Sequence, residues 1–249
     1  MQQILTFRLY APLGAMGGVA VGEQRDGWDR PGRSAVLGLT AACLGLDRTD
    51  EAAQQALEQG YGVGLLIEHA GPVLIDYHTA QVPPARRGVR YATRAEELAD
   101  RQALGTILSR RAYRADVLVL GAVWERAAPR WPLTALAEAM QCPRFTPYLG
   151  RKSCPLGLPL APRIEPAADP VAALRARRAE PAEAILHGQI LPWRRNEPLL
   201  ALDAADVPVG YPGLLRTERR RDALASRARW QFDLRDEAVL RLLEPPPCS

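Results

Sequence analysis

The chain has 249 residues, 47% of them hydrophobic, which is enough to bury a full core as one large domain or as one domain with an elaboration. No apolar run reaches the roughly 18 residues of a membrane-spanning helix, and residues 1–12 lack the basic start and long apolar core of a signal peptide. We therefore expect a cytoplasmic protein without a membrane partner. The four cysteines form no CxxC pair, which argues against a zinc site or a disulfide framework, so we expect no metal and no other cofactor.

Residues 3–10 alternate between the two faces of a half-buried strand and lead into a glycine-rich stretch, residues 11–32, which predicts a long irregular loop. Apolar residues then recur at helical spacing from about Pro31 until Gly45. Arg30 and Arg33 lie at the start of this helix, where exposed backbone amides already favour anions, so we expect both to hold a phosphate. The alternative is that two unfavourably placed charges are merely tolerated.

Residues 50–59 predict a short polar helix. Alternating residues 61–69 and 73–77, separated by a turn at 70–72, predict a β-hairpin. The hairpin ends in the sequence DYHT, whose His78 is one of three histidines and the general-base candidate of the central chain. A lone histidine is more often a hydrogen-bonding surface or core residue, so His78 could equally be structural.

Residues 79–114 carry eight arginines against three acidic residues, an excess larger than the net charge of +4 of the whole chain. Their guanidinium groups can grip phosphate and stack on bases. We interpret residues 80–111 as a basic insertion, partly helical around residues 95–102, that interrupts the sheet. Residues 116–124 then predict a central apolar strand, and residues 132–140 a second helix. The eight arginines are Arg86, Arg87, Arg90, Arg94, Arg101, Arg110, Arg111 and Arg114.

Residues 142–160, CPRFTPYLGRKSCPLGLPL, combine cations, aromatics and four prolines, with no acidic residue. Because each proline removes a backbone donor, the segment must be a shaped loop rather than a helix or central strand. Cations and aromatics on a rigid loop can hold a phosphate backbone and stack unpaired bases. The alternative is a surface turn whose aromatics pack inward and whose cations are only solvated. The candidate residues are Arg144, Phe145, Thr146, Tyr148, Arg151, Lys152 and Ser153.

The order of elements up to this loop, strand, helix, strand, strand, helix, predicts an α+β fold with a ferredoxin-like, RRM-like βαββαβ palm, the scaffold of RNA-recognition modules. We expect residues 1–249 to form a single domain. We expect residues 161–249 to form a β-rich extension packed on the palm, with a helix at 169–180, a strand at 199–202 and an edge strand at 230–234.

Four blocks carry a resemblance to a known family: RLYAPLGAMG (residues 8–17), RPGRSAVLGLTAACLGL (30–46), DYHT (76–79) and PRFTPYLGRKSCPLGLPL (143–160). They resemble the repeat-associated-mysterious-protein superfamily of CRISPR-associated proteins, and within it the Cas-five group with the CasD subunits of type I-E Cascade. The resemblance implies a thumb-like insertion at residues 79–113 and a non-catalytic subunit that grips the 5′ handle of CRISPR RNA for antiviral defence. It also implies contacts with Cascade backbone subunits and the large subunit, and with target DNA through the complex.

The resemblance extends to single residues at matching motif positions: Arg33, His78, Arg110 and Arg111 at the base of the thumb, and Phe145, Tyr148, Arg151, Lys152 and Ser153 in the loop. Met16 stands where relatives commonly carry tryptophan, so no stacking role is expected there. Three alternatives stay open. The chain could cut repeat RNA by metal-free attack of a 2′-hydroxyl through Tyr77, His78 and Lys152. Its basic face could instead serve assembly with a partner protein, or bind DNA.

Overall fold

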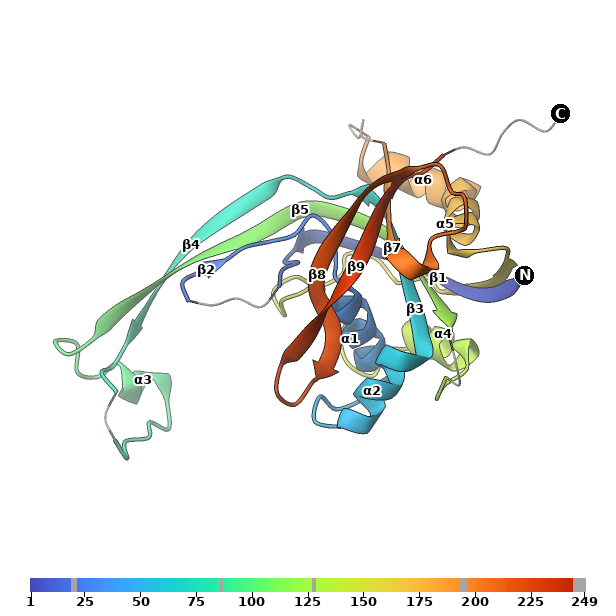
Figure 1. The fold of residues 1–249 in the computed structure, drawn as a ribbon. Helices are drawn as coiled ribbons and strands as arrows, with labels where there is room; N and C mark the ends of the chain where they lie inside the picture. The colour runs from blue at the N-terminus through green and yellow to red at the C-terminus, as the bar shows by residue number, and fades with distance from the viewer. Residues whose placement is uncertain (19–21, 86, 127–128, 193–196, 244–249) are drawn as a thin grey trace.

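The computed structural model describes residues 1–18, 22–85, 87–126, 129–192 and 197–243, and Arg86 and Cys248 lie outside this range. Its strands form one sheet in the order β6-β1-β5-β3-β7-β9-β8 (Figure 1), in which all neighbours along this path are antiparallel. A short strand, β2, runs parallel to β5. The strands are β1 (Gln2–Gly14), β2 (Gln24–Arg25), β3 (Tyr61–His69), β4 (Val73–Val82), β5 (Gly105–Glu125), β6 (Arg163–Ala167), β7 (Leu199–Asp203), β8 (Leu214–Ser226) and β9 (Gln231–Arg241).

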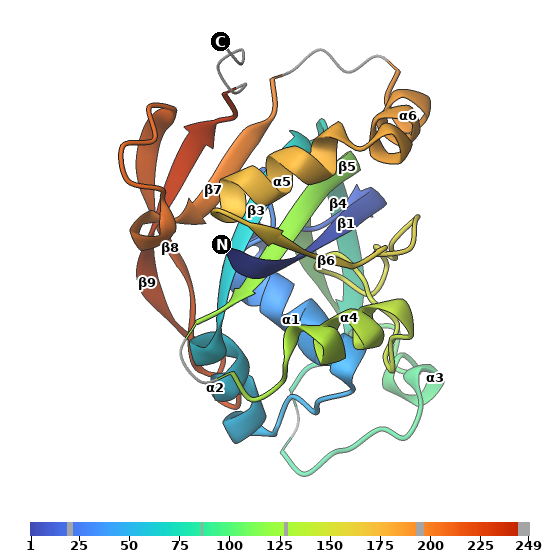
Figure 2. The ribbon, with the colours of Figure 1, turned by 90° about the vertical axis from the view of Figure 1, so that its right-hand side faces the viewer.

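Helices cover both faces of the sheet (Figure 2). Because successive residues of a strand point to opposite faces, Leu5 and Phe7 of β1 join a core cluster with α1, α2 and α4, whereas Ile4 joins a second cluster with α5. Within the described residues, no helix combines the length and apolarity needed to cross a membrane. The helices are α1 (Arg33–Leu44), α2 (Glu51–Gly60), α3 (Arg94–Glu97), α4 (Leu133–Gln141), α5 (Pro170–Ala179) and α6 (Pro181–Ile190).

Strands β4 and β5 extend beyond the body as a two-stranded arm, with α3 near its tip (Figure 1). The predicted hairpin of residues 61–69 and 73–77 is wrong, because β3 and β4 do not pair with each other. Both pair with β5: β3 with its second half and β4 with its first half. Between β3 and β4, Gly71 passes so close to β5 that a Cβ there would lie 1.9 Å from the carbonyl oxygen of Ala115. Glycine also allows the φ of +77° at this position. The two strands therefore lie end to end.

Most predicted elements of the first two thirds are confirmed, including the strand at 116–124, which lies between β1 and β3. The two ends of the stretch 80–111, residues 80–82 and 105–111, lie in β4 and β5, and its helix is limited to the single turn of α3. The helix at 169–180 and the strand at 199–202 are confirmed, whereas β6 and α6 were not predicted. Since β7 pairs with β3, the C-terminal strands extend the same sheet. The α+β class is confirmed.

Candidate nucleic-acid interface

The loop of residues 142–160 is fixed at both ends by backbone hydrogen bonds. Near its start, the N–H groups of Arg144 and Phe145 donate to the carbonyl oxygens of Cys43 and Ala42, at 3.0 and 3.1 Å. These acceptors belong to the last turn of α1, where carbonyl groups lack partners within the helix. Further along, Gly157 donates to the carbonyl of Tyr10 in β1, at 2.9 Å. The loop is thus a fixed connection between α4 and β6.

A tight turn at residues 149–154 presents the most basic part of this loop. The N–H of Leu149 donates to the carbonyl of Cys154 at 2.9 Å, and both side chains are buried. Gly150 has φ +87°, and a Cβ there would lie 1.6 Å from the carbonyl oxygen of Ala15, so only glycine fits. Arg151, Lys152 and Ser153 form the crest of this turn.

The aromatic residues of the loop face solvent. Phe145 is 51% exposed and Tyr148 39% exposed, so the alternative in which they pack inward is wrong. Thr146, Lys152 and Ser153 are also exposed. Within the described part of the chain, neither Lys152 nor the equally exposed Arg144 has an ion pair with a carboxylate. The loop therefore offers cations and aromatic faces that the fold itself does not use.

Arg151 joins the loop to the base of the arm. Its guanidinium carbon lies 4.5 Å from the ring centroid of Tyr113 in β5, a cation–π contact, and its Nη1 lies 3.5 Å from the carbonyl oxygen of Ala112. Tyr113 was not among the predicted site residues. Its position two residues after Arg111 in an alternating strand was the available signal, because such residues share a face.

The two arginines predicted at the base of the arm, Arg110 and Arg111, lie on opposite faces of the arm. His78 lies directly opposite Ser109, so His78, Arg111 and Tyr113 share one face of the arm. Arg111 is half-buried and donates from Nε to the hydroxyl of Ser109 at 3.1 Å. Arg110 is exposed on the other face, opposite Tyr77. The structure thus brings Arg151, Arg111 and His78 toward one side and leaves Arg110 on the other.

The three residues considered for RNA cleavage do not form one cluster. Tyr77 and His78 are consecutive in β4, so their side chains point to opposite faces. The imidazole of His78 is 46% exposed, and its Nδ1 lies 3.9 Å from Asp76. Within the described residues, no group of three or more His, Cys, Asp or Glu side chains could hold a metal ion.

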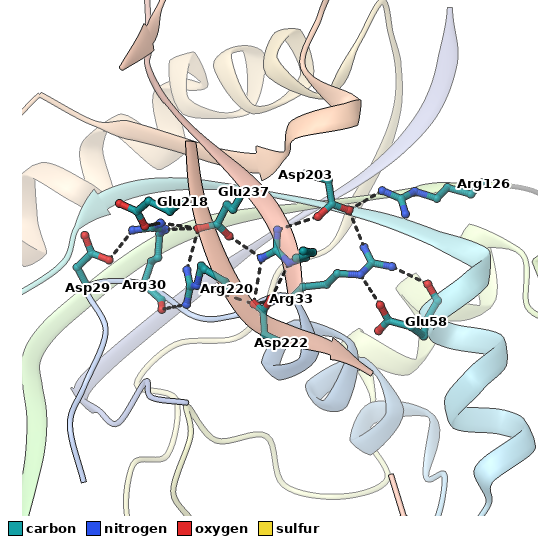
Figure 3. Close-up of polar contacts among 11 residues, drawn as sticks. Asp29, Arg30, Arg33, Glu58, Arg126, Asp203, Glu218, Arg220, Asp222 and Glu237 are labelled. Carbon is teal, nitrogen blue, oxygen red and sulfur yellow. Dashed lines mark hydrogen bonds and ion pairs between the residues drawn. The ribbon is translucent and has the colours of Figure 1, made fainter. Parts of the chain in front are cut away.

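Arg33, expected to hold a phosphate, points into the protein (Figure 3). Its side chain is 3% exposed, and its guanidinium donates to the carboxylate of Glu58 at 2.8 Å and to the carbonyls of Glu58 and Tyr61 at 2.6 and 2.8 Å. The start of α1 already has an anion, since the N–H of Arg33 donates to the carboxylate of Asp222 at 2.8 Å. The expectation that Arg33 binds phosphate is wrong, because Asp222 of β8 fills that place.

Arg30 is also buried, with 4% of its side chain exposed, and it too contacts carboxylates (Figure 3). It forms ion pairs with Glu237 of β9, Glu218 of β8 and the adjacent Asp29. Burial lowers the pKa of Arg30, but the charges of Glu237 and Asp29 and the hydrogen bonds with Glu218 and Glu237 outweigh it and raise the pKa. The expectation that Arg30 holds a phosphate is therefore wrong as well. The side chain of Arg30 binds the C-terminal β8–β9 hairpin to the segment before α1, whereas the side chain of Arg33 binds α1 to the end of α2 and the start of β3.

Comparison with known proteins agrees with this architecture. The family described as CRISPR-associated protein (Cas_Cas5) matches residues 4–237. The CRISPR system Cascade subunit CasD of Escherichia coli (strain K12) is 32% identical over 174 residues, which make up 70% of this chain and 76% of that protein.

Two solved structures share the fold. One, described as a CRISPR RNA-guided surveillance complex, gives a TM-score of 0.59 at 22% identity and covers 96% of this chain and 89% of that chain. Another, a crystal structure of a Cas protein, gives a TM-score of 0.56 at 24% identity over 96% and 95% of the two chains. The family match over nearly the whole length and the identity to CasD agree with the resemblance of the sequence blocks. The chain belongs to the Cas5 family of CRISPR-associated proteins.

Proposed function

We propose that this chain is a non-catalytic, RNA-binding subunit of a Cascade-type surveillance complex that grips the 5′ handle of CRISPR RNA. In this proposal β1, α1, β3, β5, α4 and β6 form a ferredoxin-like βαββαβ palm, whose sheet order β6-β1-β5-β3 suits that scaffold. Residues 79–113 serve as its thumb, and residues 161–249 extend the palm.

One observation carries the proposal: a backbone-fixed loop exposes Phe145 and Tyr148 beside Arg144 and Lys152. Unpaired bases of a single strand can stack on such aromatic rings, at about 1–3 kcal/mol per base. Cations without internal partners can neutralise phosphates. The hydroxyl groups of Thr146 and Ser153 can read base edges, as in other single-strand RNA readers.

The relatives support the partners that we propose. The CasD protein of E. coli is named as a Cascade subunit, and we propose corresponding contacts here with backbone subunits and the large subunit, and with target DNA through the complex. Such a complex would act in the cytoplasm. The arm is the largest projection of the described chain (Figure 1), which suits a role in spanning RNA and a neighbouring subunit.

The test is a salt titration of RNA binding by the purified full chain, with a labelled CRISPR RNA and the same RNA with a scrambled 5′ handle. Each lost contact with a phosphate of single-stranded RNA should reduce the slope of log K against log salt by about 0.7. We expect the double variant Arg151→Ala, Lys152→Ala to bind the handle RNA more weakly, with a slope smaller by about 1.4. Wild-type affinity and slope in this variant would overturn the proposal.

Two controls sharpen this test. The double variant Arg216→Ala, Arg219→Ala removes the same charge from exposed positions of β8 and should leave affinity unchanged. In the assembled complex, release of a protein subunit without loss of RNA would indicate an assembly role instead. Incubation of labelled repeat RNA with the protein in EDTA should leave the RNA intact, and a specific cut that disappears in His78→Ala would show catalysis.

A further inference from the structure

The turn between β8 and β9 places an exposed tryptophan within cation–π distance of two arginines. Trp230 is 51% exposed, and the guanidinium carbons of Arg227 and Arg48 lie 4.5 and 5.1 Å from its ring centroid. Arg227 comes from the same turn, whereas Arg48 follows α1. The ring of Phe232 lies 6.2 Å from that of Trp230, at an angle of 48°. Segments about 180 positions apart in the chain thus build one aromatic and cationic surface.

The turn is held in place by α2. The carboxylate of Glu51, in the first turn of α2, accepts hydrogen bonds from the N–H groups of Arg227 and Ala228, at 3.1 and 2.9 Å. The side chain of Gln55, one turn further along, donates to the carbonyl of Ala225 at 2.6 Å. Trp230 itself has φ +52°, an uncommon backbone conformation for a bulky residue that the surrounding contacts must maintain.

In the described part of the chain neither arginine is in an ion pair with a carboxylate, although the hydrogen bonds from Thr49 and then the charge of Arg48 lower the pKa of the adjacent Asp47. The nearby carboxylates are used by other groups, since Glu51 accepts backbone N–H groups and Asp47 accepts from Thr49. The buried Nε of Arg227 has no hydrogen-bond acceptor. Burial and then the positive charge of Arg48 lower the pKa of Arg227, which Tyr148 partly offsets. Two like charges are therefore held together around one ring.

This surface differs from the ion network on the same hairpin. There Arg30, Arg33 and Arg235 each meet carboxylates of the protein within 2.8 Å (Figure 3 shows this network). The fold pairs these arginines closely with carboxylates but leaves the buried Nε of the half-buried Arg227 without an acceptor. An anion from outside the chain would supply the missing acceptor and relieve the repulsion between the guanidinium groups.

We propose that Trp230, Arg48 and Arg227 form a second contact for single-stranded RNA, in which the indole stacks on an unpaired base and the guanidinium groups hold the adjacent phosphate. This turn and the loop of residues 142–160 both lie against α1, since a Cβ at Gly38 would lie 3.5 Å from a guanidinium nitrogen of Arg227 and the N–H of Arg144 donates to the carbonyl of Cys43. One strand can therefore pass from the loop onto the β8–β9 turn. The inference rests on the proposed function in that its ligand is RNA, and it assigns the C-terminal hairpin a role beyond packing.

The experiment uses the full chain and the labelled CRISPR RNA. Trp230→Ala should weaken binding roughly ten-fold, as loss of one stacked base would, and Trp230→Phe should retain most of the affinity. Arg227→Ala should lower the salt slope by about 0.7. Leu234→Ala, which truncates an exposed apolar side chain of β9 at 51% exposure, is the matched control and should change neither quantity.

A spectroscopic readout separates contact from indirect effects. RNA should quench tryptophan fluorescence in the wild type, and that part of the quenching should be absent in Trp230→Phe. If Trp230→Ala and Arg227→Ala bind RNA as the wild type does while Arg151→Ala, Lys152→Ala is weakened, this inference is wrong and the proposed function stands. If all of these variants bind normally, both are wrong. Release of a protein subunit instead of RNA from the assembled complex would overturn the inference in favour of a protein partner.

Discussion

Replacing Arg33 with alanine should destabilise the protein rather than weaken a phosphate contact. The substitution leaves the carboxylate of Glu58 and two backbone carbonyls without their donor. Removing one partner of a buried ion pair costs about 3–5 kcal/mol. The two orphaned carbonyls would add to this if water could not reach them. The side chain of Glu58 is 13% exposed, so water can solvate it in part, and we expect a total of about 3–5 kcal/mol.

Urea unfolding followed by circular dichroism measures this loss, and a thermal scan should show a midpoint lower by roughly 6–20 °C. Arg219→Ala, at a side chain that is 76% exposed, is the matched control and should cost less than about 1 kcal/mol. The decisive comparison is with RNA binding by the folded protein. If Arg33→Ala unfolds at the wild-type urea concentration but shows a smaller salt slope for RNA, then Arg33 contacts phosphate and the structural reasoning is refuted.

Three further predictions concern acid stability, thiol reactivity and the loop turn. Burial raises the pKa of Glu183, but a hydrogen bond from a histidine and two arginine charges outweigh it and lower the pKa from 4.5 to about 2. The free energy of unfolding should therefore decrease by roughly 3 kcal/mol as the pH is lowered from 4.5 to about 2. Urea titrations of Glu183→Gln should lack this decrease. Burial raises the pKa of the Cys43 thiol to about 11, so iodoacetamide at pH 8 should alkylate the exposed Cys142 and spare Cys43, as peptide mapping by mass spectrometry can establish. Gly150→Ala should distort the turn at residues 149–154 and weaken RNA binding, whereas Gly188→Ala, which meets open space in α6, should leave binding unchanged; equal binding by both would contradict the tight fit.

The sequence predicted correctly those elements that depend on neighbouring residues alone. The alternation in residues 3–10 and the apolar run 116–124 correspond to β1 and the core half of β5. The prolines of residues 142–160 likewise predicted a loop, because they remove backbone donors wherever the segment lies. Strand pairing was harder to predict, because the sequence at residues 70–72 is compatible both with a chain that reverses into a hairpin and with one that continues in the same direction. Only the position of β5 determines that it continues.

The charged residues were predicted less well than the strands. Arg30 and Arg33 were interpreted from their own helix, but the side chain of Arg30 pairs with Glu237, 207 positions away, and the N–H of Arg33 with Asp222, 189 positions away. The local sequence at a helix start is the same whether the arginine there binds a phosphate or a carboxylate from a distant part of the chain. Arg177 is another fully buried arginine, matched by Glu183. The exposure of Phe145 and Tyr148 could not be predicted either, because it depends on what packs against the loop.

Strand β5 runs without interruption from the arm into the centre of the sheet, a length of 21 residues. Its core half is hydrogen-bonded to β1 on one side and to β3 on the other. These pairings also determine the direction of the arm and which face each of its side chains occupies. Residues could be added in pairs to β4 and β5 at the tip, and every side chain nearer the body would keep its face. A single residue added to β5 between its core half and Arg111 would exchange the faces of Arg110 and Arg111. The reach of the arm can therefore evolve in steps of two residues per strand, while the core stays unchanged.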